Sequence, residues 1–123
     1  MDILSKAHAD AMRKELHELV AELIAELGPT AVQAMTGTRD RSMPAAWARQ
    51  DSRPRARTET QLRLGYRVWS MMQENEGPRV AAAWMIGANP RLGEDTPLTA
   101  IRDLHPADVV GAAEAFIAAN YVA

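Results

Sequence analysis

Apolar residues recur along this chain at three- and four-residue steps, the spacing that places side chains on one face of an α-helix. The clearest run predicts a helix from Ser5 to Leu27 that ends at Gly28. Its apolar positions are Met12, Leu16, Leu19, Val20, Leu23 and Leu27. Alternating β-branched runs, which mark strands, are scarce. The pattern therefore predicts an all-α fold.

Prolines and glycines set the limits of two short helices that follow. One is predicted at Pro29–Met35 and closed by Gly37, and the next begins at Ser42 or Met43 and carries Trp47. Two helices of this length, joined by a short turn, match the order of a helix-turn-helix. In such a unit the second helix enters the major groove of DNA and reads its bases.

A longer helix is predicted after the polar connector of residues 51–57. Thr58 and Gln61 have the spacing of a capping box and predict its start, and the apolar pattern continues to about Glu74. Apolar residues fall on several sides of this helix, so we expect it to be buried on more than one face.

The C-terminal part has two proline signals around one tryptophan. We expect Asn89-Pro90 to stop the helix that carries Trp84, because the residue before a proline avoids the α region. Thr96 as N-cap and Pro97 at the first helical position predict the start of the next helix. The helices expected from there on are Pro97–Arg102 and Pro106–Ala119.

The best boundary between two halves is Glu76-Gly77-Pro78. It divides the chain into an N-terminal, helix-turn-helix-like unit of residues 1–76 and a small C-terminal helical domain of residues 77–123. A chain of 123 residues, 47% of them hydrophobic, suits one domain or two small halves that share a core.

Composition restricts the compartment and the chemistry. Cysteine is absent, which excludes disulfides, thiolate metal sites and thiol nucleophiles. The longest uncharged run, Val80–Pro90, has 11 residues, whereas a membrane span needs about 20. Charged residues interrupt the N-terminus, unlike the apolar core of a signal peptide. We therefore expect a cytoplasmic protein with no membrane partner.

Charge is distributed unevenly along the chain. Residues 39–67 hold eight arginines against three acidic residues, a net charge of +5, although the whole chain carries −2. Residues 1–38 carry −3 and residues 68–123 carry −4. The planar fork of arginine suits phosphate and guanine. The basic segment therefore predicts either contact with nucleic acid or a solvated face that pairs with the acidic flanks or an acidic partner.

Candidate DNA-binding residues lie around the second short helix. Three precede it or open it, and four follow it, where they would clamp the backbone of the duplex. They are Arg39, Arg41, Ser42, Arg49, Arg53, Arg55 and Arg57. Trp47 has two interpretations, an anchor of the helical core or an exposed aromatic that contacts bases, and the core interpretation is favoured because such units read grooves rather than stack on bases.

This region resembles the Xre-type helix-turn-helix of bacterial antitoxins, in which a tryptophan on the third helix is followed several residues later by a proline, as Trp47 and Pro54 stand here. It departs from that pattern at Pro44, inside the presumed reading helix, and in having no glycine between Trp47 and Pro54. The departures argue against sequence-specific reading of DNA more than against the fold.

A second resemblance covers residues 78–118. The positions that carry it are Trp84, Asn89, Pro90, Leu92, Gly93, Pro97, Leu98, Ile101, Val109 and Val110. They resemble the toxin-binding domain shared by MbcA, ParS and Xre antitoxins. The resemblance implies an antitoxin that packs this domain and its extreme C-terminus against the active-site opening of a RES-domain toxin, an enzyme that consumes NAD.

By that resemblance, the toxin-binding residues fall into a signature and a tail. The signature is Trp84, Asn89, Pro90, Leu92 and Pro97, and the tail contributes Asn120, Tyr121 and Val122. The alternative is that the signature forms the core of a small helical hairpin. For the tail, the alternative is that it docks on its own domain instead of a partner.

Motifs for catalysis are incomplete. His17-Glu18 begins a zinc-protease pattern, but Ala21 stands where the second histidine is needed. Gly87 and Gly93 follow no predicted strand and so form no phosphate-binding loop. We therefore predict no catalytic, cofactor-binding or metal-binding residue, no cofactor, and no enzyme activity.

The sequence thus favours the antitoxin of a type II toxin-antitoxin pair, which would block its toxin sterically and act as a homodimer or as a hetero-oligomer with the toxin. The alternative function is a DNA-binding transcriptional regulator that binds operator DNA through the basic region. A third interpretation is an oligomeric adaptor or phage-borne decoy of the same domain.

Overall fold

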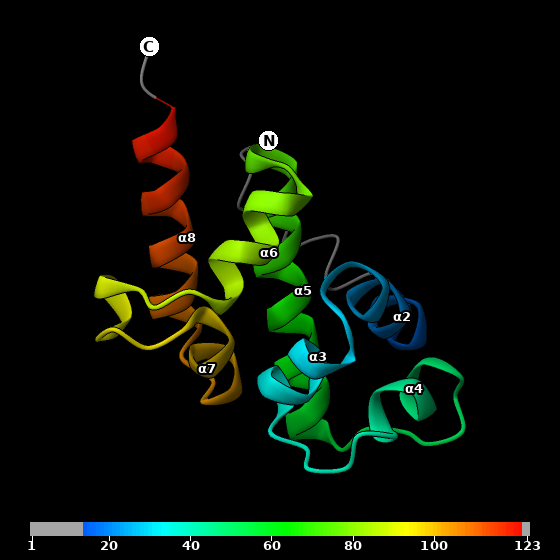
Figure 1. Ribbon diagram of the computed structural model, residues 1–123. Helices are drawn as coiled ribbons and strands as arrows, with labels where there is room; N and C mark the ends of the chain where they lie inside the picture. The colour runs from blue at the N-terminus through cyan, green and yellow to red at the C-terminus, as the bar shows by residue number, and fades with distance from the viewer. Residues whose placement is uncertain (1–13, 122–123) are drawn as a thin grey trace.

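Helices account for nearly all regular structure in the part of the chain that the computed structural model describes, residues 14–121 (Figure 1). In chain order they are α2 (Leu16–Leu27), α3 (Pro29–Thr36), α4 (Met43–Ala48), α5 (Ala56–Glu76), α6 (Pro78–Ile86), the 3-10 turn η1 (Pro90–Leu92), α7 (Pro97–Arg102) and α8 (Pro106–Asn120). No strand occurs in these residues, apart from a single antiparallel bridge between Asn89 and Asp95. The prediction of an all-α fold is confirmed.

The central element is α5, which runs through the middle of the molecule with α6 and α8 on one side and α2 and α4 on the other (Figure 1). Its buried residues fall on every side of the helix: Gln61, Leu62, Leu64, Gly65, Tyr66, Val68, Trp69, Ser70, Met71 and Met72. The expectation that this helix is buried on more than one face is confirmed.

Helix α3 packs closely against α5 at Gly65. A Cβ built on Gly65 would lie 2.5 Å from the sulfur of Met35, which is itself fully buried. Glycine at this position therefore lets the two helices pack together, because any larger residue would displace the buried Met35 side chain.

Residues from both sides of Gly77 share one hydrophobic core. The core contains Leu23 of α2 and Val32 of α3 together with Ile101 of α7 and Val109 of α8. Met72 of α5 belongs to the same cluster. The two halves divided at Glu76-Gly77-Pro78 are consequently joined by apolar packing, as expected for small units that cannot each bury enough surface alone.

The first predicted helix differs from the observed one. Its positions 5–13 lie outside the described residues, but Glu15 is extended, so no helix runs unbroken into α2 at Leu16. The backbone carbonyl of Lys14 accepts a hydrogen bond of 2.9 Å from the Arg63 guanidinium of α5. This tertiary contact fixes Lys14 just before α2, at a position where the apolar pattern alone predicted a continuous helix.

The capping box predicted at Thr58 and Gln61 is wrong. The helix begins at Ala56, and its N-cap is Arg55, three residues before Thr58, without a side-chain capping bond. Gln61 instead donates its side-chain amide to the carbonyl of Arg102, 2.7 Å away. A bond to a distant helix end has replaced the local one that the spacing suggested.

The C-terminal elements follow their sequence signals closely. Thr96 caps α7, since its hydroxyl accepts the amide of Thr99 at 3.1 Å, and Pro97 occupies the first helical position as predicted. The helix that carries Trp84 ends at Ile86, earlier than Asn89-Pro90 requires, because Gly87 is already extended.

None of the helices in residues 14–121 is long and apolar enough to cross a membrane.

Candidate functional site

Asn89 organises the loop between α6 and α7. Its side-chain oxygen accepts the amide of Arg91 at 2.9 Å, and its backbone carbonyl accepts the amides of Leu92 and Glu94, each at 2.9 Å. Its own amide donates to the carbonyl of Asp95 at 3.0 Å, which closes the loop. An asparagine that stabilises its own turn explains why this residue type stands before Pro90.

The structure divides the predicted signature residues between core and surface. Pro97 is buried, and Trp84, Asn89 and Leu92 are half-buried, whereas Pro90 is exposed. Leu98 and Ile101, which accompany the signature, are buried in the core. Most of the signature therefore builds the local fold, and Pro90 is its member most open to a partner.

Exposed apolar side chains collect in the C-terminal half. Within residues 14–121 the large hydrophobic residues that are exposed are Val80 (43%), Ile86 (64%) and Tyr121 (82%), on α6 and just after α8. Trp84 and Phe116 join the same two helices, with ring centroids 6.3 Å apart and planes tilted by 56°. A contiguous patch of such residues marks a surface that binds a protein, whereas single exposed apolar residues are common.

The C-terminal tail is partly attached to the rest of the molecule. The side-chain amide of Asn120 lies 3.3 Å from the carboxylate of Glu76, at the end of α5. Tyr121 is exposed, and Val122, the third residue predicted in the tail, lies outside the described residues. Asn120 thus contacts its own chain, while the Tyr121 ring is open to solvent.

The predicted DNA-binding residues lie at the opposite end of the molecule. The two loops that flank α4, and the start of α5, are at one end in Figure 1, and the C-terminus is at the other. Arg39, Arg41, Arg55 and Arg57 are all exposed there. Ser42 is exposed too, but its hydroxyl and amide donate to the carboxylate of Asp40, at 2.6 and 2.9 Å.

The remaining two predicted arginines have acidic neighbours. Arg49 donates to Asp51 at 2.9 Å, and Arg53 lies 3.9 Å from Glu59. Both arginines are largely in solvent, where such ion pairs contribute about 0–1 kcal/mol and exchange readily. Neither pairing prevents the guanidinium from turning to another anion.

Arg102 belongs to the same end of the molecule, although the sequence interpretation assigned it no role. Its carbonyl accepts hydrogen bonds from Gln61 and, at 3.4 Å, from Arg57. Its side chain lies over Gly37, where a built Cβ would be 3.4 Å from the Arg102 Cδ atom. No local pattern could reveal this, because Arg57 and Arg102 are brought together by the packing of α7 against α5 and α3.

The helix expected to read DNA bases has an unsuitable surface. The residues of α4 are Met43, Pro44, Ala45, Ala46, Trp47 and Ala48. Only Trp47 has a side-chain hydrogen-bond donor, and it is 6% exposed, which confirms the core interpretation of this residue. The helix thus presents no polar side chain to the edges of bases.

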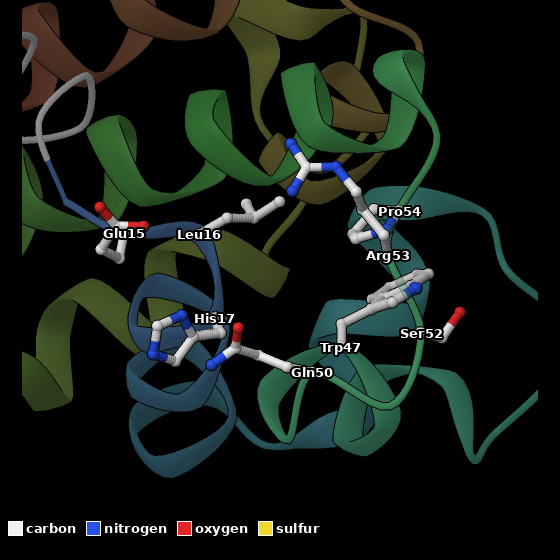
Figure 2. A pocket seen from close by; sticks show the side chains of 8 residues that line it. All are labelled: Glu15, Leu16, His17, Trp47, Gln50, Ser52, Arg53 and Pro54. Atoms are coloured by element: carbon white, nitrogen blue, oxygen red, sulfur yellow. The ribbon is translucent and has the colours of Figure 1, made fainter.

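A pocket of 270 Å³ lies between the start of α2 and the loop after α4. It is lined by Glu15, Leu16, His17, Trp47, Gln50, Ser52, Arg53 and Pro54. Figure 2 shows the Arg53 guanidinium extending toward Leu16 and the Gln50 amide toward His17, while the Ser52 hydroxyl points away from both. The hydroxyl and the imidazole therefore do not form a nucleophile-and-base pair, which requires hydrogen-bond contact.

The backbone beside this pocket is tightly held. Gln50 has a positive φ of 64°, an uncommon conformation for a residue with a side chain. Its amide donates to the carbonyl of Trp47, and the amides of Asp51 and Ser52 both donate to the carbonyl of Ala46. These bonds turn the chain sharply after α4 and direct the arginine-rich segment back toward α5.

Lys14, Glu22 and Tyr66 form the clearest electrostatic cluster. Lys14 lies 3.6 Å from Glu22 and over the Tyr66 ring, 5.5 Å from its centre. Burial raises the pKa of the Tyr66 phenol, and the Glu22 carboxylate raises it further. The pKa of Lys14 is also raised, chiefly by its charge interaction with Tyr66. The cluster holds residue 14 against α2 and α5.

Acidic side chains do not gather into a metal site in residues 14–121, where no three histidine or carboxylate groups are placed to hold an ion. A second cavity, of 350 Å³, lies between the 91–95 loop and the α7–α8 junction, lined in part by Asp95, Asp103, His105 and Asp108.

Comparison of the chain with protein-family models, curated proteins and solved structures finds no match.

Proposed function

We propose that this protein is the antitoxin of a type II toxin-antitoxin pair, and that its C-terminal half binds and blocks an NAD-consuming enzyme of the RES type. The choice of partner rests on the resemblance of residues 78–118 to toxin-binding domains. The blocking is steric, so no residue of this chain has a chemical role and no cofactor is needed. Such a pair acts in the cytoplasm.

The observation that carries this proposal is the position of the exposed apolar side chains. Val80, Ile86 and Tyr121 all lie on α6 or just after α8, within or beside the part of the chain that resembles the toxin-binding domain. Burying an exposed aromatic or aliphatic side chain of this size in an interface contributes about 1.5–3 kcal/mol. Tyrosine is also enriched among the residues that dominate binding energies at interfaces.

A second candidate function is a DNA-binding transcriptional regulator, which is favoured by the exposed arginines around α4. It ranks second because α4, the helix that would read the operator, presents no polar side chain. An antitoxin that also binds its operator would combine both functions.

Co-expression tests the antitoxin proposal directly. The chain is produced in a bacterial host together with the product of the adjacent gene, and growth, cellular NAD and co-purification are measured. We expect the neighbour alone to stop growth and deplete NAD, and the pair to restore both and remain together on a column. A neighbour that is harmless, or that does not bind, would contradict the proposal.

Matched variants locate the interface. Ile86→Ser and Tyr121→Ala remove exposed apolar groups and are expected to weaken binding and NAD protection while leaving the thermal unfolding curve unchanged. Arg39→Ala and Arg41→Ala, at the opposite end, serve as controls and are expected to protect as well as the parent chain. Loss of protection in the controls alone would place the interface at the basic end instead.

A further inference from the structure

Six exposed arginines gather at the end of the molecule opposite the C-terminus. They come from three separate parts of the chain: the loop before α4, the segment that leads into α5, and the end of α7. We call this surface the basic end, and it consists of Arg39, Arg41, Arg53, Arg55, Arg57 and Arg102. The basic end includes a residue outside the arginine-rich segment of the sequence, because α7 contributes Arg102, 45 positions after Arg57.

Most of these cations are available to an incoming anion. Within residues 14–121, no carboxylate lies at ion-pair distance from Arg39, Arg41, Arg55 or Arg57. Arg53 and Arg102 do have acidic neighbours, at 3.9 and 3.1 Å, but these pairs are on the surface. Exposed pairs of this kind are weak and give way to a stronger ligand.

The acidic groups among these arginines are engaged in local bonds. The carboxylate of Asp40 accepts both the hydroxyl and the amide of Ser42, and these bonds lower the pKa of Asp40. The carboxylate of Asp103 accepts a hydrogen bond from the guanidinium of Arg102. Both carboxylates keep their negative charge, but the six arginines of the basic end outnumber them, so the surface remains positive.

The fold fixes the spacing of the basic end. The left-handed turn at Gly37 leads the chain past the side chain of Arg102, and α5 binds the carbonyl of Arg102 through Gln61 and Arg57. The cations thus project from a framework of packed helices. Several arginines carried by one framework can contact several charges of a polyanion at once, which a single small anion does not offer.

We propose that the basic end binds the phosphate backbone of duplex DNA without reading its sequence. Arginine forks form paired hydrogen bonds with phosphate oxygens, which supplies the affinity. Base recognition needs polar side chains on the element that enters the groove, and α4 presents none. The interaction is therefore set by charge and shape, and it is independent of the protein partner proposed above.

Fluorescence anisotropy of the full chain with labelled duplexes tests this inference. Two duplexes of equal length and composition but unrelated sequence are expected to bind with affinities within about threefold of each other. If about four phosphates are neutralised, raising the salt from about 50 to 200 mM is expected to lower the affinity about a hundredfold. No binding at the lower salt, or a preference above about tenfold for one sequence, would overturn the proposal.

Two double variants that remove the same charge from different surfaces distinguish binding at the basic end from an effect of the net charge of the protein. Arg55→Ala with Arg57→Ala removes two cations from the basic end, and Arg79→Ala with Arg91→Ala removes two exposed cations from α6 and η1. The first pair is expected to reduce the slope of log affinity against log salt by about two, and the second to leave it unchanged. Equal losses in both pairs would refute a site at the basic end.

Arg102→Ala examines the contribution that only the tertiary structure revealed. We expect it to reduce the same slope by about one, while circular dichroism melting shows that the fold is retained. An unchanged slope would exclude Arg102 from the site. Arg102→Lys keeps the charge and is expected to restore the slope, which distinguishes a charge contact from a structural role of this side chain.

Discussion

Gln61, buried in the first half of α5, donates its side-chain amide to the backbone carbonyl of Arg102 at the end of α7, over 2.7 Å. The last carbonyls of a helix have no partner within the helix, so they take donors from other elements or from water. Gln61 supplies one of them, and Arg57 supplies a second, longer bond at 3.4 Å. The two halves of the chain are thus joined by polar contacts as well as by the shared core.

Replacing Gln61 by leucine is expected to destabilise the protein by about 0.5–1.5 kcal/mol, because the Arg102 carbonyl loses its shorter bond and keeps only the longer one from Arg57. Chemical denaturation measures the effect. Gln73→Leu, a half-buried glutamine on the same helix, is the control and is expected to change stability by less. Equal stabilities of the two variants would show that the bond between α5 and α7 contributes nothing.

Gly65→Ala is expected to lower the free energy of unfolding by about 1–3 kcal/mol, although alanine favours helices. The new methyl group would meet the sulfur of Met35, so this fully buried side chain would have to move within a packed core. Gly111→Ala in α8 is the matched control. Its Cβ would have no heavy atom within 4 Å, so a gain of about 0.5–1 kcal/mol is expected.

Thermal or urea unfolding of the two glycine variants gives the comparison directly. Loss of stability in both would mean that helix glycines matter here for a reason other than space. Gly65→Ala is expected to cost less unfolding free energy in a Met35→Ala background than in the parent chain, since the smaller residue makes room for the new methyl group.

Stability is expected to fall as the pH rises above about 10, and Tyr66 is one cause. Burial raises the pKa of its phenol in the folded state, so the folded protein retains this proton at a pH where the unfolded chain has lost it. The raised pKa therefore contributes stability below the unfolded pKa, and the contribution is lost as the pH passes the folded pKa. Lys14, whose pKa is also raised, acts in the same direction.

The ultraviolet absorbance of tyrosinate measures this titration. The chain has two tyrosines, and Tyr121→Phe leaves Tyr66 as the only one, so the signal can be assigned. We expect its midpoint to lie above that of a model tyrosine peptide. A midpoint at or below the peptide value would contradict the burial of the phenol against α2.

Deletion of residues 120–123 is expected to weaken neutralisation of the proposed toxin partner with little change in melting temperature. Among the described residues the deletion removes the surface bond between Asn120 and Glu76 and the bond from the Tyr121 amide to the Ala118 carbonyl. It also removes the exposed aromatic ring of Tyr121. Asn120→Ala alone serves as the control and is expected to neutralise normally. If the truncated chain protects cells as well as the full one, the interface excludes the tail.

The sequence by itself determined the helices and most of their limits, because these depend on neighbours within one or two turns. The step of three and four residues gave the all-α fold, and the prolines at 29, 44, 97 and 106 stand in the first turn of the helices that they were expected to open. Trp47 was correctly assigned to the core. For these features the local rules and the tertiary packing favour the same structure.

Only the tertiary structure decided which residues share a surface and which local signals are overruled. Gln61 was expected to cap its own helix, yet it binds the Arg102 carbonyl, which has no partner within α7, whereas the start of α5 is on the surface where water can serve its free amides. The packing of α7 against α3 brings Arg102 into the basic end. The packing of α4 leaves only small or apolar residues on its outer side. Spacing along the chain reports periodicity, whereas contact between residues 45 positions apart depends on how whole helices bury their apolar faces together.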